Sequence, residues 1–171
     1  MAGRGAGGGG AGGGQSAGFV LTSPTLSQGG MFPPELTCAG VDTSPEFDWT
    51  AGPAGAQSFA LVLTDMANNL VHWVVWDIPP ATRSLPAMLA TTAMLATPAG
   101  ARQLATGGGT AYTGPCPSGN LHTYQFDLHA VDAAMLPGVA ANATTTQVKA
   151  AVMMHSLAKA SLSAQSNAKR P

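Results

Sequence analysis

The sequence has few charged residues, few aromatic residues and only two cysteines. Charged residues make up 9% of the 171 residues, whereas an average soluble protein has roughly a quarter. The net charge is −1, so the chain lacks the strongly basic surface that nucleic acids and anionic lipids require. A nucleic-acid-binding function is therefore excluded, and most of the surface must be covered by small uncharged side chains.

Long apolar runs are also absent. No segment approaches the roughly 20 apolar residues of a membrane-spanning helix, and no secretory signal with an apolar core is present. The chain opens on a glycine-rich stretch, which we interpret as a flexible leader over residues 1–18. Such a leader would suit an exported or tethered domain if the natural start lies upstream. The 45% hydrophobic content predicts one packed domain over 19–165 and a short tail over 166–171.

Cys38 and Cys116 are the only cysteines of the chain. Two cysteines allow one disulfide but do not require it, so the sequence leaves both alternatives open. Neither cysteine has the C-x-x-C spacing that is typical of a structural metal site. We expect no cofactor.

Alternating hydrophobic residues predict several strands. Residues 57–65 alternate cleanly, and residues 72–77 are apolar on both faces, which indicates an inner strand. The clearest strand spans 122–132, with aromatic and aliphatic residues on one face and polar residues on the other. We expect the apolar face to contact the core and the polar face, which includes His129, to meet solvent.

The remaining segments have weaker signals. Residues 81–106 have no steady period and are expected to be loop with at most a short turn of helix. From Thr145 to about Ala164, apolar residues recur at helical spacing, which predicts a helix with Thr144 or Thr145 as its N-cap and His155 on its apolar face. These patterns together predict a mainly β fold, an antiparallel β-sandwich with a C-terminal α-helix.

Two histidines mark the candidate site. His72 directly precedes Trp73, His122 precedes Tyr124 by two positions, and a run rich in glycine and proline, 112–119, lies between the two histidines. Glycine and proline fix the path of a loop, and such loops commonly position binding groups. Imidazoles can become positively charged near neutral pH and then donate strong hydrogen bonds to phosphate or carboxylate oxygens. We expect Asp65 to orient one imidazole, and the backbone N–H groups of the Gly114 loop to add further donors.

Four sequence blocks resemble, in the same order, those of a known family. They are Asp42–Trp49 (D-T-S-P-E-F-D-W), Leu63–Asp65 with 72–79, Tyr112–Gly119 (Y-T-G-P-C-P-S-G), and 122–132 (beginning H-T-Y-Q-F). The family is that of the phosphatidylethanolamine-binding proteins, in its bacterial branch of Raf kinase inhibitor-like proteins. The resemblance extends from about Phe19 to the predicted C-terminal helix.

The resemblance implies a β-sandwich with a small pocket for phosphate-like headgroups. Eukaryotic relatives inhibit kinases or act as signalling scaffolds. Residue by residue, the pocket should comprise Asp65, His72, Tyr112, Gly114, Cys116, Pro117, His122 and Tyr124. The chain departs from the family twice: residues 66–69 lack the second acid and the prolines of the family's loop, and Ser118 replaces a proline. Ligand preference therefore does not carry over.

The sequence thus predicts a non-enzymatic module for a small phosphorylated or carboxylated ligand, and it leaves two alternatives open. Asp65, His72 and His122 have the composition of a two-histidine, one-carboxylate metal site, so a metal-dependent hydrolase is one alternative. A kinase or protease inhibitor that acts by protein–protein contact is the other. A serine hydrolase is disfavoured because no G-x-S-x-G motif is present, and Ser118 is the one serine worth testing.

Several other residues receive structural interpretations. Asp42, which precedes a Ser-Pro pair, is interpreted as holding a turn through side chain–backbone hydrogen bonds. Four methionines are interpreted as core or loop filling rather than as metal ligands: Met88, Met94, Met153 and Met154.

Overall fold

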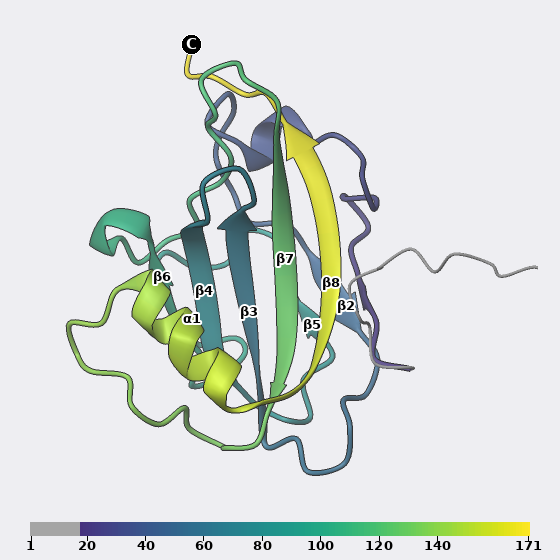
Figure 1. Cartoon of the computed structure of the whole chain (residues 1–171), viewed down its shortest axis with the longest axis vertical. Helices are drawn as coiled ribbons and strands as arrows, with labels where there is room; N and C mark the ends of the chain where they lie inside the picture. Colours follow the sequence, from purple (N-terminus) through teal and green to yellow (C-terminus); the bar gives the residue numbers. More distant parts are fainter. Residues whose placement is uncertain (1–17) are drawn as a thin grey trace, which may run out of the picture.

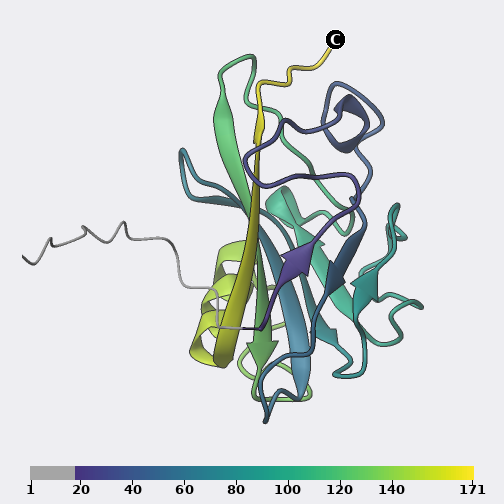
Figure 2. The same ribbon diagram turned by 90° about the vertical axis from the view of Figure 1, so that its right-hand side faces the viewer.

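The structure, a computed structural model, describes residues 18–171. Two antiparallel sheets face each other, and the α-helix of this region covers the outer side of the larger sheet (Figures 1 and 2). The predicted mainly β sandwich with a helix near the C-terminus is therefore confirmed. The predicted leader lies outside the described residues, apart from Gly18.

The two sheets differ in size. The smaller sheet has the strand order β1-β2-β5, and its strands are short: β1 Leu21–Thr22, β2 Phe47–Trp49 and β5 Ser84–Leu85. The larger sheet has the order β6-β4-β3-β7-β8: β6 Arg102–Ala105, β4 Leu70–Ile78, β3 Ser58–Asp65, β7 His122–Val131 and β8 Ser156–Ser166. Two 3₁₀ turns, η1 Pro34–Leu36 and η2 Thr106–Gly108, lie in the connections.

The central strands are buried on both faces, as the sequence predicted for 72–77. All eight residues of β3 are buried. Phe59, Leu61 and Leu63 face the smaller sheet, whereas Ala60 and Val62 face the helix side. Both faces must be apolar because each is covered by another layer.

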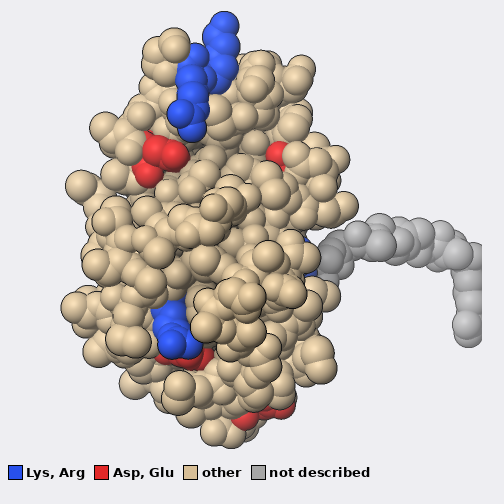
Figure 3. Space-filling model, turned by 90° about the vertical axis from the view of Figure 1, so that its left-hand side faces the viewer, with Lys and Arg blue, Asp and Glu red and all other residues tan. Residues whose placement is uncertain are grey.

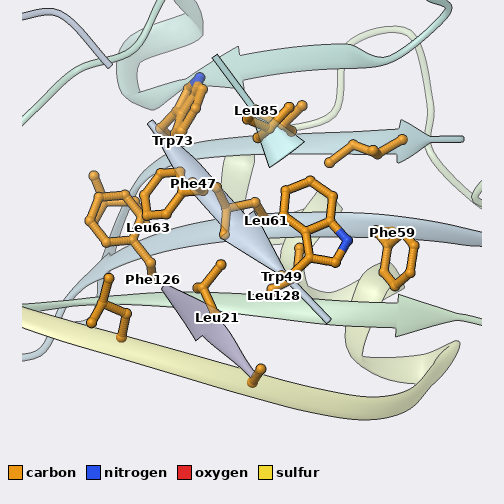
Figure 4. Close-up of a cluster of buried hydrophobic side chains, with 14 of the residues drawn as sticks. Leu21, Phe47, Trp49, Phe59, Leu61, Leu63, Trp73, Leu85, Phe126 and Leu128 are labelled. Carbon is orange, nitrogen blue, oxygen red and sulfur yellow. The ribbon is translucent and has the colours of Figure 1, made fainter. Parts of the chain in front are cut away.

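Aromatic side chains fill the space between the sheets (Figure 4). The ring centroid of Phe47 on β2 lies 4.7 Å from that of Phe126 on β7, and Trp49 meets Phe59 edge-on at 5.7 Å. Full burial of one such side chain contributes about 1.5–3 kcal/mol relative to exposure. These contacts hold the short strands of the smaller sheet against the larger one.

The C-terminal helix is shorter than the sequence predicted. Helix α1 spans Thr145–Met154 and begins with Thr144 as N-cap, where Thr144 and Gln147 form a capping box. The chain then enters strand β8, which pairs with β7. A helix to Ala164 is wrong because alternate residues from Ala158 to Ala164 are buried, which is the period of a strand.

His155 ends the helix instead of lying on its apolar face. It is the C-cap residue, and its Nδ1 lies 2.8 Å from Asp132 Oδ1. Packing in the core is therefore the wrong interpretation for this histidine, since the pair is partly exposed to solvent.

The segment 81–106 also differs from its prediction. It contains β5 and β6 in addition to loops, and β6 pairs with β4 at the sheet edge. The side chain of Gln103 on β6 is buried, where its Oε1 accepts a hydrogen bond from Trp73 Nε1 at 3.0 Å. An edge strand needs apolar residues on only one face. The sequence of this short segment therefore shows no clear hydrophobic periodicity.

The four methionines do not fill the core. All four are exposed to solvent: Met88, Met94, Met153 and Met154. The core interpretation is wrong for them because Met88 and Met94 lie in the loops between β5 and β6, and the other two lie at the exposed end of α1.

His129 is buried, contrary to its prediction. It lies on the outer face of β7, is only 5% exposed, and its Nδ1 lies 2.9 Å from Ser156 Oγ. The prediction of a solvated face failed because the start of β8 and nearby side chains cover this part of β7. Burial lowers the pKa of His129 to about 4, with nearby Asp127 opposing this shift.

We expect the His129→Gln variant to be less sensitive to acid than the wild type. The pKa of His129 is lower in the folded protein than in the unfolded chain. As the pH falls from about 6.5 to about 4, the unfolded chain therefore binds a proton at this residue and the folded wild type does not, so the wild type loses stability. Between pH 7 and pH 4, the free energy of unfolding of the wild type should fall by about 3 kcal/mol more than that of the variant. Urea denaturation at pH 7 and pH 4 measures it, and His155→Gln serves as a control. If the free energy of unfolding falls equally in the wild type and in His129→Gln between pH 7 and pH 4, the prediction is wrong.

Candidate functional site

The ends of β3 and β7 bring Asp65 and His122 together. Asp65 is the last residue of β3 and His122 the first of β7, and the register places Asp65 opposite Tyr124. His122 Nδ1 lies 2.8 Å from Asp65 Oδ2. The Asp65 side chain is 3% exposed and that of His122 is 22% exposed. The imidazole is thus the solvent-facing member of the pair, and a carboxylate orients it as the sequence predicted for one histidine.

His72 lies on the next strand, at an irregularity of the sheet. The register between β3 and β4 shifts between Leu63 and Thr64, and His72 has no residue opposite it there. Such a bulge re-aims a side chain. The Nδ1 of His72 lies 3.2 Å from the carbonyl oxygen of Thr113. Since a carbonyl can only accept, this nitrogen carries the hydrogen.

The ring of His72 is buried. Burial lowers the pKa of His72, and the hydrogen bond to Thr113 and the negative charge of Asp65 only partly oppose this shift. We therefore expect a neutral His72 at neutral pH, with Nε2 available as an acceptor.

Tyr124 lies between the two imidazoles. Its ring centroid is 5.4 Å from that of His72, edge-on, and 6.3 Å from that of His122, stacked. Burial raises the pKa of the Tyr124 phenol well above its usual range, and the Asp65 carboxylate raises it further through its charge and a hydrogen bond. The hydroxyl therefore stays protonated beside the Asp65 carboxylate.

A disulfide fixes the Gly-Pro loop, which settles the question that the sequence left open. Cys38 and Cys116 are bonded, with their Cα atoms 5.4 Å apart, and the Cys38 N–H donates to the Pro115 carbonyl at 3.2 Å. Pro117 is buried, and its carbonyl accepts a hydrogen bond from Asn120 N–H at 3.2 Å. The loop is thereby joined to the segment that follows η1.

Two groups that the sequence offered to a ligand are already engaged within the protein. The Tyr112 hydroxyl donates to the Leu36 carbonyl at 3.0 Å, and the Gly114 N–H donates to Asp42 Oδ1 at 2.9 Å. Among the backbone N–H groups of this loop that we expected to serve a ligand, that of Gly114 itself is not free, because Asp42 Oδ1 accepts it. The side chain of Asp42 does accept a hydrogen bond from the backbone, as predicted, but its partner lies in a distant loop and not in the predicted turn.

Position 114 leaves no space for a side chain. A Cβ atom there would contact the Leu36 carbonyl oxygen, Asp42 Oδ1 and the Tyr112 ring. Because the Leu36 oxygen belongs to the backbone, it cannot move away cheaply. Glycine is required here by close packing, and the loop can approach η1 only with this residue.

Sequence reasoning missed the contribution of the C-terminal tail. The Gly119 N–H donates to the Ala168 carbonyl at 3.4 Å, so the tail runs beside the Gly-Pro loop. Burial raises the pKa of Asp42, while the Gly114 N–H and the positive charge of Arg170 oppose that shift. The adjacent Lys169 and Arg170 were the available signal, but nothing in the sequence placed them near the site.

The site does not have the geometry of a metal centre. Across residues 18–171, no group of three or more His, Cys, Asp or Glu side chains is arranged to hold a metal ion. Four surface hollows of about 280 to 510 Å³ are lined by other residues, so the candidate site depends on converging side chains rather than on one of these hollows. In the same region, no helix is both long and apolar enough to cross a bilayer.

Comparison with known proteins agrees with this architecture. The sequence profile of the family described as phosphatidylethanolamine-binding protein matches residues 22–167. The chain is 36% identical over 131 residues to the UPF0098 protein YbhB of Escherichia coli, covering 73% of this chain and 82% of YbhB. It is 32% identical over 150 residues to a UPF0098 protein of Chlamydia pneumoniae, covering 83% and 94%.

A solved structure shows the same fold. The crystal structure of Escherichia coli YbcL, described as a member of the mammalian PEBP family, superposes with a TM-score of 0.76 at 24% identity, covering 89% of this chain and 99% of YbcL. Sequence profile, relatives and fold thus agree, and the chain belongs to the phosphatidylethanolamine-binding protein family.

Proposed function

We propose that this protein is a non-enzymatic module that binds a small phosphorylated or carboxylated group at the Asp65–His122 pair. Membership in the family supports a ligand-binding or regulatory module in general. The observation that carries the specific proposal is the 2.8 Å contact between His122 Nδ1 and the buried Asp65 carboxylate, which leaves the rest of the imidazole toward solvent.

The hydrogen-bond pattern supports an oxyanion ligand. Asp65 is occupied, because Oδ2 faces His122 Nδ1 and Oδ1 accepts the Ala67 N–H at 2.9 Å. The carboxylate therefore orients the imidazole, and Nε2 of His122 remains for the ligand. In its protonated form, this nitrogen donates a charge-assisted hydrogen bond to a phosphate or carboxylate oxygen.

His72 would add selectivity for a ligand that carries a hydrogen. Its Nδ1–H is committed to the Thr113 carbonyl, so a neutral His72 offers only the Nε2 lone pair. A singly protonated phosphate can donate to this nitrogen while it accepts from His122. This division of roles favours a phosphate monoester over a simple carboxylate.

Ring resonances of His72 and His122 should test the proposal. Titration with inorganic phosphate, phosphoethanolamine or acetate, followed by NMR, should shift the His122 ring, with the largest change for the phosphates. The ring of His155 is the internal control, because it forms a similar pair with Asp132 at the end of α1. If neither site ring responds to millimolar ligand, the proposal is wrong.

Neither alternative function gains a specific observation. A metal-dependent hydrolase needs Asp65, His72 and His122 to converge on one ion, and the described residues lack such a group. Metal analysis of protein purified without chelators tests this alternative directly. Ser118 is exposed at the tip of the Gly-Pro loop, and none of its described hydrogen bonds reaches a histidine. No feature of the described surface marks an interface for an inhibited kinase or protease.

A further inference from the structure

A hollow lined mainly by polar side chains lies on the outer face of the larger sheet, beside α1. It has a volume of about 390 Å³ and is lined by residues of β3, β7, α1 and β8, among them Thr64, Asp127, His129, Lys149 and Lys159. Charged side chains are sparse on this protein, as on the face shown in Figure 3. Two of the three lysines of the chain nevertheless line this one hollow.

The hollow and the Asp65–His122 site lie on opposite faces of the sheet. Thr64 lines the hollow, and the next residue of β3, Asp65, pairs with His122. Successive side chains of a strand point to opposite faces, so a molecule in the hollow would not contact the first site. The two sites can therefore be tested independently.

The charges of the hollow do not balance. Lys159 Nζ lies 3.3 Å from Asp127 Oδ1, so these two charges form an ion pair. Lys149 Nζ donates to the Thr64 hydroxyl at 3.0 Å, and none of the acidic residues in 18–171 forms an ion pair with it. The ammonium group of Lys149 is thus left without a direct ion-pair contact among these residues.

One oxygen of the Asp127 carboxylate already has several partners. Its Oδ1 already accepts hydrogen bonds from Gln125 Nε2 and Ser161 Oγ in addition to the contact with Lys159. His129 adds no negative charge, because an imidazole is either neutral or cationic, and its Nδ1 contacts Ser156 Oγ. Burial lowers the pKa of Lys149, and the positive charge of Lys159 lowers it too, although Asp127 opposes both. An anion beside Lys149 would relieve this unfavourable environment.

We propose that this hollow is a second binding site, which takes a small oxyanion between the ammonium groups of Lys149 and Lys159. The ligand class is defined by its oxygens, which a phosphate or a carboxylate supplies equally. Met66 and Met153, both exposed, lie at the same hollow and provide an apolar edge for the remainder of the ligand.

Methionine methyl groups give a direct readout of this site. In the His122→Ala variant, which silences the first site, titration with inorganic phosphate or acetate should shift the methyl NMR signals of Met66 and Met153. The signals of Met88 and Met94, which lie in loops away from the hollow, should not move. A response to phosphate alone, to acetate alone or to both supports the site and identifies the preferred oxyanion.

Substitution of Lys149 decides whether the ammonium binds the anion. Lys149→Gln should weaken the response at least about tenfold, as expected for loss of a charge-assisted hydrogen bond, and Lys149→Arg should retain it. Lys169→Gln, which removes an exposed lysine of the tail, should leave the response unchanged. The proposal is overturned if neither oxyanion moves the Met66 and Met153 signals, or if Lys149→Gln responds as strongly as the parent.

Discussion

The His122→Ala variant is expected to lose phosphate binding at the Asp65–His122 site while remaining folded. Its imidazole is the solvent-facing member of the buried pair with Asp65, and no other described side chain occupies that position. Removal of the ring takes away the charge-assisted donor and leaves the Asp65 carboxylate to repel an anion. NMR of the His72 ring during titration with phosphoethanolamine measures the loss at this site.

The cost in stability should be small, about 1 kcal/mol. Asp65 keeps the hydrogen bond from the Ala67 N–H after the substitution, so the carboxylate is not left without a partner. His155→Ala is a matched control, because it breaks a histidine–aspartate pair of the same 2.8 Å length outside the site. Global unfolding of His122→Ala, or equal loss of binding in both variants, would show that His122 has a structural role instead.

Removal of the Cys38–Cys116 bond is expected to lower the free energy of unfolding by about 4 kcal/mol. The two cysteines are 78 residues apart in the sequence. A crosslink over so long a segment restricts the unfolded chain strongly. The double variant Cys38→Ala/Cys116→Ala should therefore unfold at a clearly lower denaturant concentration than the oxidised wild type. Denaturation followed by tryptophan fluorescence measures the difference.

Dithiothreitol provides the control for this variant. It should lower the stability of the wild type to that of the double variant and leave the double variant itself unchanged. The bond also joins the Gly-Pro loop to the segment after η1, where the Tyr112 and Asp42 contacts are made. If wild type and variant unfold at the same denaturant concentration, these hydrogen bonds hold the loop without the disulfide.

The parts of the fold that were predicted from sequence are those with a strong periodic pattern. Residues 57–65 and 122–132 alternate over at least eight positions, and both are strands of the larger sheet. The hydrophobic pattern led to a wrong prediction in the alanine-rich segment near the C-terminus. From 156 to 166, alanine and leucine occur at both helical and strand spacing, so local pattern did not reveal that pairing with β7 makes this segment a strand.

The candidate site was predictable in composition but not in its bonds. The family blocks indicated which residues gather, yet the sequence did not say which histidine Asp65 would orient. That choice depends on the register between β3 and β7, together with the bulge at His72, and both are set by pairing across the sheet. The same limit applies to Gly114 and Tyr112, whose partners, Asp42 and Leu36, lie more than 70 residues away.

Because side chains alternate along β7, the candidate site and the hydrophobic core depend on the same register of this strand. His122 and Tyr124 share one side of this strand with Phe126, Leu128 and Ala130, which belong to the core. A shift of β7 by a single residue would turn all of these side chains outward together. A chain with this error would misfold rather than persist as an intact but inactive protein. Quality control that removes unstable chains therefore also preserves the side chains of this strand that belong to the candidate site.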